Sequence, residues 1–135
     1  MKAHVTSTPK TVLIWNIPEG SVSRRAMDRA AAAAGMTIRA VGPEDLNQSI
    51  ASLCGLPGPC LMKPEAGKPE QDFPAAAVFC GLDDWKLDIV LADLHKQGAV
   101  IPLKATVTPT NQHWTLGKLL EELCAERAAL AGAPV

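Results

Sequence analysis

Residues 56–74 are the feature that most constrains the fold, because they separate two similar halves of the chain. The segment contains five prolines and two glycines, a composition typical of a linker or a long surface loop. On each side of it, short apolar runs alternate with stretches of helical periodicity. We therefore expect one βαβα half over residues 10–55 and a second βαβα half over residues 75–127.

The first half begins with a continuous apolar run, TVLIWNI at residues 11–17, of the kind found in buried strands. The alanine-rich residues 24–34 predict a helix, with Ser23 as its N-cap. Residues 37–41 predict a second strand, and Pro43 suits the first turn of a following helix. The buried side of that helix would consist of Leu46, Ile50 and Leu53.

The second half repeats this order of elements. Residues 75–80 predict a buried strand, and residues 83–97 predict a helix with Asp83 as its N-cap and a single apolar stripe. Residues 99–107 predict the last strand. Because Pro102 cannot donate a hydrogen bond to a neighbouring strand, this strand is expected either to lie at an edge of the sheet or to begin at that proline.

Alternating strands and helices predict an α/β protein with a three-layer open sheet of about four mostly parallel strands. The suggested strand order is 2-1-3-4. A ferredoxin-like α+β fold is the main alternative, and it requires one of the predicted helices to be absent. If the strands are parallel, the loops after the first, third and fourth strands meet at one edge of the sheet and form a site there.

The chain has 135 residues and a formal net charge of −1. That length fits one domain, which we expect to span residues 1–135. The balanced charge provides no field that would attract nucleic acid or an anionic membrane. No stretch reaches the roughly 18 apolar residues of a membrane span, and the N-terminal residues do not resemble a secretory signal. We therefore expect a cytoplasmic protein.

Polar side chains concentrate after the last predicted strand, just before a helix that Thr115 would cap. They could hold a small anionic ligand at the positive end of that helix, with Lys104 as the charge partner, or they could contact a protein partner. Alternatively, the threonines and the asparagine only satisfy the backbone of their own turn. The candidate ligand-binding residues are Lys104, Thr108, Thr110, Asn111, His113 and Trp114.

The chain contains four cysteines, which we expect to be reduced because nothing indicates secretion. Cys54 and Cys60 do not have the spacing of a zinc motif, and no glycine-rich phosphate loop follows the first strand. We expect neither a metal nor a cofactor. Cys80, at a strand end before a helix, could form a nucleophilic pair with His113, although a free cysteine is commonly a small core residue.

Residues 77–127 contain VFCGLDDWKLDIVLADLHKQG followed by IPLKATVTPTNQHWTLGKLLEELCAE. This stretch resembles the bacterial family described as domain of unknown function 3783. The resemblance implies a bacterial cytoplasmic protein and no particular activity. The matching positions are Pro102, Leu103, Lys104, Ala105, Thr108, Pro109, Thr110, Asn111, Trp114, Thr115, Leu116, Glu121, Glu122 and Leu123.

These observations favour a noncatalytic ligand-binding or regulatory α/β module, with its polar site at the carboxyl ends of the strands. The alternative is a small thiol-dependent enzyme or redox protein that uses Cys80 and His113. The exposed edge strand after Pro102 could also pair two copies of the chain into a homodimer.

Overall fold

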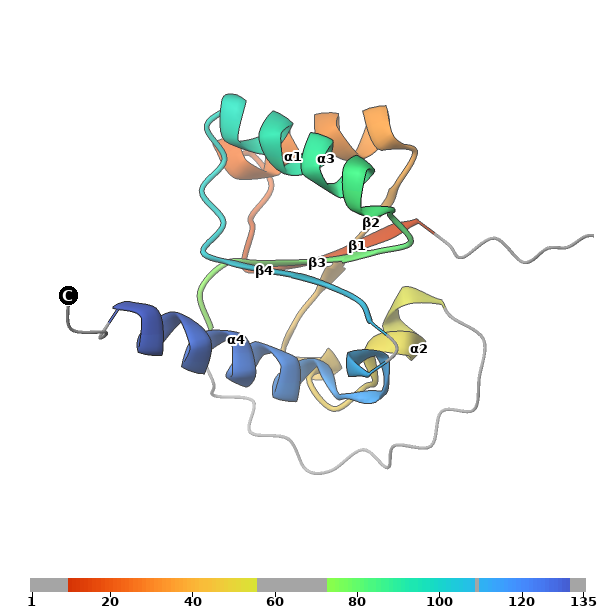
Figure 1. Cartoon of the computed structure of the whole chain (residues 1–135), viewed down its shortest axis with the longest axis vertical. Coiled ribbons are helices and arrows are strands. Elements are labelled where there is room, and N and C mark those ends of the chain that lie inside the picture. The colour runs from red at the N-terminus through yellow and green to blue at the C-terminus, as the bar shows by residue number, and fades with distance from the viewer. Residues whose placement is uncertain (1–9, 56–72, 109, 132–135) are drawn as a thin grey trace, which may run out of the picture.

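The structure is a computed structural model that describes residues 10–55, 73–108 and 110–131. It contains a mixed α/β fold with one four-stranded open sheet in the order β2-β1-β3-β4 (Figure 1). The predicted α/β class and strand order are therefore confirmed. Most of the predicted linker at residues 56–74 lies outside the described residues. The strands are β1 (Thr11–Trp15), β2 (Thr37–Val41), β3 (Ala76–Cys80) and β4 (Leu103–Thr106).

The sheet is mostly parallel, but its central pair is antiparallel. β1 runs parallel to β2, and β3 runs parallel to β4. Between the halves, β1 and β3 pair in opposite directions, with Leu13 opposite Val78 at the middle of the pair. β1 and β3 consequently point in opposite directions, and the loops that follow them leave from opposite ends of the strands. The prediction that the loops after the first, third and fourth strands meet is therefore wrong for the first strand.

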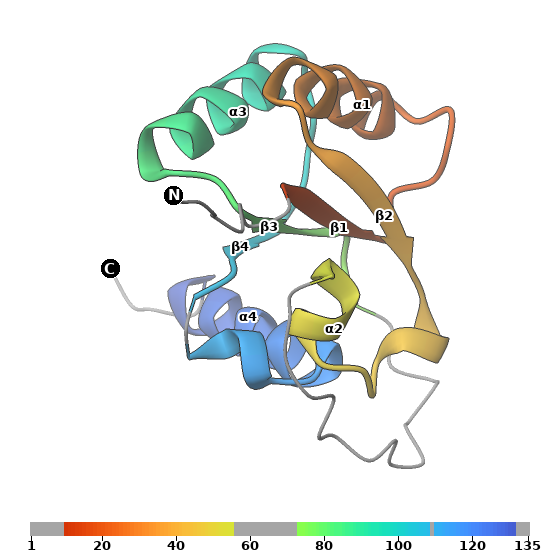
Figure 2. The same cartoon turned by 90° about the vertical axis from the view of Figure 1, so that its right-hand side faces the viewer.

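In the described part of the chain, four helices cover the two faces of the sheet in pairs, α1 with α3 on one face and α2 with α4 on the other (Figure 2). Each half thus contributes one helix to each face. Together with the antiparallel central pair, this arrangement relates the halves by an approximate two-fold axis perpendicular to the sheet. The helices are α1 (Val22–Ala34), α2 (Ile50–Cys54), α3 (Asp84–Lys96) and α4 (Leu116–Ala131).

The core has two layers, one on each face of the sheet, because the central strands β1 and β3 are covered on both sides. All five residues of β1 and all five of β3 are buried, as expected for apolar runs covered on both faces. One layer joins Leu13 and Val78 to leucines of α2 and α4. The other joins Ile14 and Phe79 to the alanines of α1 and the apolar stripe of α3. Small alanines allow α1 to lie close to the sheet.

The first helix begins two residues earlier than predicted. Its N-cap is Ser21, whose side chain accepts a hydrogen bond from the backbone N–H of Arg24 at 3.1 Å. Ser23 is not the cap, because its hydroxyl accepts a hydrogen bond at 3.0 Å from the backbone N–H of Val100 in the second half. Gly35 closes the helix in the left-handed conformation, with a φ of 71°.

The single helix predicted after Pro43 is divided into two pieces. A 3-10 turn at Pro43–Asp45 comes first, and α2 begins only at Ile50. Ser49 causes the new start, because its side chain accepts a hydrogen bond from the N–H of Ser52 at 3.1 Å and caps α2. Leu46, Ile50 and Leu53 are nevertheless buried, as expected.

The two halves also meet where α2 and α4 begin. Ser49 and Thr115, the residues before these helices, form an isolated antiparallel bridge. The N–H of Ile50 donates to the carbonyl of Trp114 at 2.9 Å, and the N–H of Leu116 donates to the carbonyl of Gln48 at 2.9 Å. Thr115 caps α4 as predicted, since its hydroxyl accepts from the N–H of Lys118 at 3.1 Å.

Among the described helices, none has both the length and the apolar composition needed to cross a membrane.

Candidate functional site

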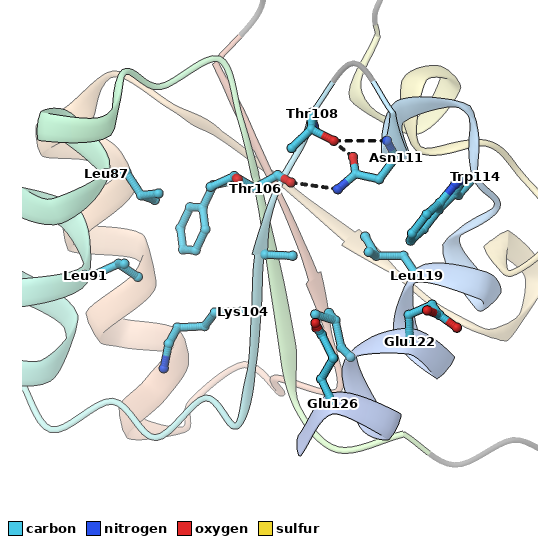
Figure 3. A pocket seen from close by; sticks show the side chains of 13 residues that line it. Leu87, Leu91, Lys104, Thr106, Thr108, Asn111, Trp114, Leu119, Glu122 and Glu126 are labelled. Carbon is cyan, nitrogen blue, oxygen red and sulfur yellow. Dashed lines mark hydrogen bonds between the residues drawn. The ribbon is translucent and has the colours of Figure 1, made fainter. Parts of the chain in front are cut away.

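A groove runs along the outer edge of β4, between α3 and α4 (Figure 3). Its volume is about 490 Å³, which is within the range of small-molecule sites. Apolar side chains form both of its walls. The wall on the α3 side contains Phe79, Leu87 and Leu91, and the wall on the α4 side contains Trp114, Leu119 and Leu123. We call this feature the β4 groove.

The floor of the β4 groove is an unpaired strand edge, because β4 pairs with β3 alone within the described residues. The N–H of Leu103 donates to Ala75 at 3.1 Å, and the N–H of Val107 donates to Phe79 at 2.8 Å. Since peptide groups alternate along a strand, Lys104 and Thr106 direct theirs away from β3. Both alternatives predicted from Pro102 hold, because β4 lies at an edge of the sheet and begins at Leu103, directly after the proline.

Asn111 forms the end of the β4 groove through three hydrogen bonds. Its Nδ2 donates to the carbonyl of Thr106 at 2.9 Å, and its Oδ1 accepts from the N–H of Thr108 at 2.8 Å. Its own N–H donates to the hydroxyl of Thr108 at 3.0 Å. These bonds organise the turn after β4, so Asn111 and Thr108 shape the groove, while their polar groups are already used locally.

The charges in the β4 groove do not favour an anion. The Lys104 ammonium donates to the carbonyl of Ile101 at 3.0 Å, near the start of β4, so it does not reach the turn after the strand. On the opposite wall, the exposed carboxylates of Glu122 and Glu126 line the groove (Figure 3). One ammonium against two carboxylates leaves the groove with a formal charge of −1.

The structure brings four of the six predicted ligand-binding residues into one cavity. Lys104, Thr108, Asn111 and Trp114 all line the β4 groove. Trp114 is half-buried, and the Lys118 ammonium lies 5.1 Å from the centre of its ring, within the range of a cation–π contact. Thr110 and His113 are exposed and are not among the lining residues.

The predicted pairing of Cys80 with His113 has no support in the geometry. Cys80 has a relative exposure of 2% and lies in the core layer that the sheet shares with α2 and α4, whereas His113 is exposed. The His113 ring lies 3.4 Å from the side-chain nitrogen of Gln112.

Apart from Trp114, sequence reasoning missed the apolar walls of the β4 groove. Leu87 and Leu91 belong to the apolar stripe of α3 and are only half-buried, so part of that stripe faces the groove rather than the core. Leu123 on α4 is likewise half-buried and lines the groove. A helical stripe with one edge left uncovered has the same periodicity as a fully covered one, and the sequence therefore contains no direct signal of the groove.

The fold and the groove define this chain as an α/β domain built from two related βαβα halves, one of which has an open-edged cleft. Residues 76–130 match the family model described as Domain of unknown function (DUF3783). The match confirms the resemblance of the C-terminal part, and it covers all residues that line the β4 groove. No curated protein and no solved structure matches the chain.

Proposed function

We propose that this protein is a noncatalytic binding module that accepts an extended segment of a partner protein as a fifth strand beside β4. The observation that carries the proposal is the coincidence of an unpaired strand edge with an apolar groove. Strand addition obtains its affinity from main-chain hydrogen bonds and its specificity from pockets for alternate side chains. The β4 groove offers both.

The edge offers an incoming strand three peptide groups that have no partner among the described residues. They are the N–H and C=O of Lys104 and the N–H of Thr106, which point away from β3. The C=O of Thr106 already accepts from Asn111. Pairing is therefore limited to a short stretch of the partner, and Asn111 sets where it stops.

The walls of the β4 groove match the alternation of a strand. Successive side chains of an added strand point to opposite faces of the sheet. One set would pack against Leu87 and Leu91 on α3, and the other set against Leu119 and Leu123 on α4. The ligand class that fits is an extended peptide with apolar residues at neighbouring positions.

The carboxylates on the α4 wall favour a basic residue in the partner. Glu122 and Glu126 lie one helical turn apart on the same side of α4 and both reach the groove (Figure 3). A lysine or arginine of the bound segment would pair with them. This preference separates the proposal from an anionic small molecule, which the same carboxylates would repel.

Selection of peptides tests the proposed function directly. The immobilised protein is used to select from a displayed library of random eight-residue peptides, and selected peptides are measured by fluorescence anisotropy. We expect peptides with apolar residues and at least one basic residue, with dissociation constants on the order of micromolar. Failure to enrich any such peptide would contradict the proposal. Self-association detected by sedimentation would identify a second copy as the occupant instead.

Glu122→Gln is expected to weaken the selected basic peptides about threefold, because an exposed ion pair contributes less than about 1 kcal/mol. The loss should shrink as salt is raised, since screening removes the same interaction. Glu121→Gln is the matched control, because Glu121 is exposed on the same helix and does not line the groove. Equal effects of the two substitutions would exclude a specific role for the α4 carboxylates.

A further inference from the structure

A second cavity lies between α1 and α3, on the other side of α3 from the β4 groove. Its volume is about 380 Å³, which is within the range of small-molecule sites. Among the described residues, none lines both this cavity and the β4 groove. The two helices lie side by side over one face of the sheet (Figure 2). We call this feature the α1/α3 cavity.

Small side chains on α1 create the space. Their methyl groups are too short to reach across to α3, and the buried side chain of Val90 lies at the bottom of the cavity. On α3, the apolar side chains of Trp85 and Ile89 are 61% and 59% exposed and lie one helical turn apart. Single exposed apolar residues are ordinary, but these two border the same cavity. The residues that line it from α1 are Ala30, Ala33 and Ala34.

Three charged side chains border the α1/α3 cavity, namely Lys10, Lys86 and Asp93. The ion pairs within the described residues involve Arg24, so these three charges are not paired with one another. The Lys86 ammonium lies 5.5 Å from the centre of the Trp85 ring. Two ammonium groups against one carboxylate give the cavity a formal charge of +1, opposite to that of the β4 groove. A complementary ligand is therefore an anion.

We propose that the α1/α3 cavity binds a small, flat aromatic acid with a single negative charge. The ring of the ligand packs against Trp85 and Ile89, and its acid group lies near the Lys86 ammonium. Asp93 repels a second negative charge, so the ligand class is an aromatic monocarboxylate and not a polyanion. This site is separate from the β4 groove, and the proposal does not depend on strand addition there.

A titration of the whole chain with 2-naphthoate, followed by two-dimensional amide NMR, tests the proposal. We expect the backbone signals of Ala33, Trp85 and Ile89 to shift, with a dissociation constant on the order of millimolar, as the size of the probe allows. The neutral 2-naphthamide has the same ring without the charge. It should bind about threefold more weakly, since an exposed ion pair contributes little.

Ala33→Glu is expected to weaken 2-naphthoate at least about tenfold, because glutamate fills the cavity and places a second carboxylate beside Asp93. Ala32→Glu is the matched control. Ala32 is the neighbouring residue, is equally exposed and does not line the cavity, so binding should stay within about twofold of the original. Thermal unfolding shows whether both variants are folded.

Lys86→Gln tests the charge of the cavity without filling it. This variant should bind 2-naphthoate and 2-naphthamide equally. Lys118→Gln is its control, because Lys118 forms the corresponding contact with another tryptophan, Trp114, 5.1 Å from its ring centre. Lys118→Gln should keep the preference for the acid.

Four results would overturn the proposal. The first is the absence of shifts at about 10 mM 2-naphthoate, ten times the expected constant. The second is a set of shifts confined to the β4 groove. The third is equal binding by the Ala33→Glu and Ala32→Glu variants. The fourth is a shift of the same signals with protein concentration in the absence of any probe, which would identify a second copy of the chain as the occupant.

Discussion

Thr106→Pro is expected to lower the affinity for selected peptides at least about 30-fold while leaving the fold intact. Proline removes the N–H of residue 106 and places its ring where a bound strand would lie. Losing this hydrogen bond, and leaving the carbonyl of the bound peptide unpaired, costs about 2 kcal/mol. That free energy corresponds to a change of about 30-fold in the dissociation constant. The native sheet does not use this N–H, because residue 106 directs its peptide groups away from β3. Fluorescence anisotropy measures the effect.

Thr106→Val is the matched control for this prediction. Valine keeps the N–H and the β-branched shape of threonine, so affinity should remain within about threefold of the original. Thermal unfolding followed by circular dichroism shows whether each variant is folded. If a folded Thr106→Pro protein binds the peptides as well as the unmodified chain does, the partner strand does not lie beside β4.

Leu13→Ala is expected to lower the free energy of unfolding by about 3 kcal/mol, the usual cost of deleting a fully buried leucine side chain. Leu13 has a relative exposure of 1% and lies opposite Val78 at the centre of the antiparallel pair. It therefore contacts the core layer shared by both halves. Urea denaturation measures the change, with the slope of the transition reporting whether unfolding stays cooperative.

Val100→Ala is the control for this core substitution. Val100 has a relative exposure of 74%, so its truncation should change the free energy of unfolding by less than about 0.5 kcal/mol. A loss below about 1 kcal/mol for Leu13→Ala would contradict the burial of β1 between two helix layers. Loss of cooperativity in that variant would show that the halves can unfold separately.

Hydrophobic periodicity was sufficient to predict the class of fold and the strand order. The apolar runs at residues 11–17 and 75–80 identified the two central strands, and Pro102 indicated that β4 lies at an edge of the sheet or begins there. The relative direction of β1 and β3 was not predictable in this way. Short helical crossovers force parallel strands, but residues 56–74 form a connection long enough to return the chain in either direction.

Local polar bonds explain most of the remaining errors. Ser49 accepts a backbone hydrogen bond and starts α2 anew, an alternative to continuous helix that serine commonly provides. Asn111 and Thr108 were predicted as ligand contacts or as turn residues, and the structure uses their polar groups in the turn. The α4 wall of the β4 groove follows that turn directly in sequence. The wall on the α3 side is distant from the turn in sequence, and only tertiary packing brings this wall to it.

Amide hydrogen exchange at β4, with and without a selected peptide, tests the central claim most directly. In the free protein, the N–H groups of Lys104 and Thr106 should exchange rapidly, whereas that of Ala105 should already be protected by pairing with β3. Saturating peptide should slow Lys104 and Thr106 at least about tenfold and change Ala105 little. Unchanged exchange at Lys104 and Thr106 in the bound state would contradict strand addition at this edge.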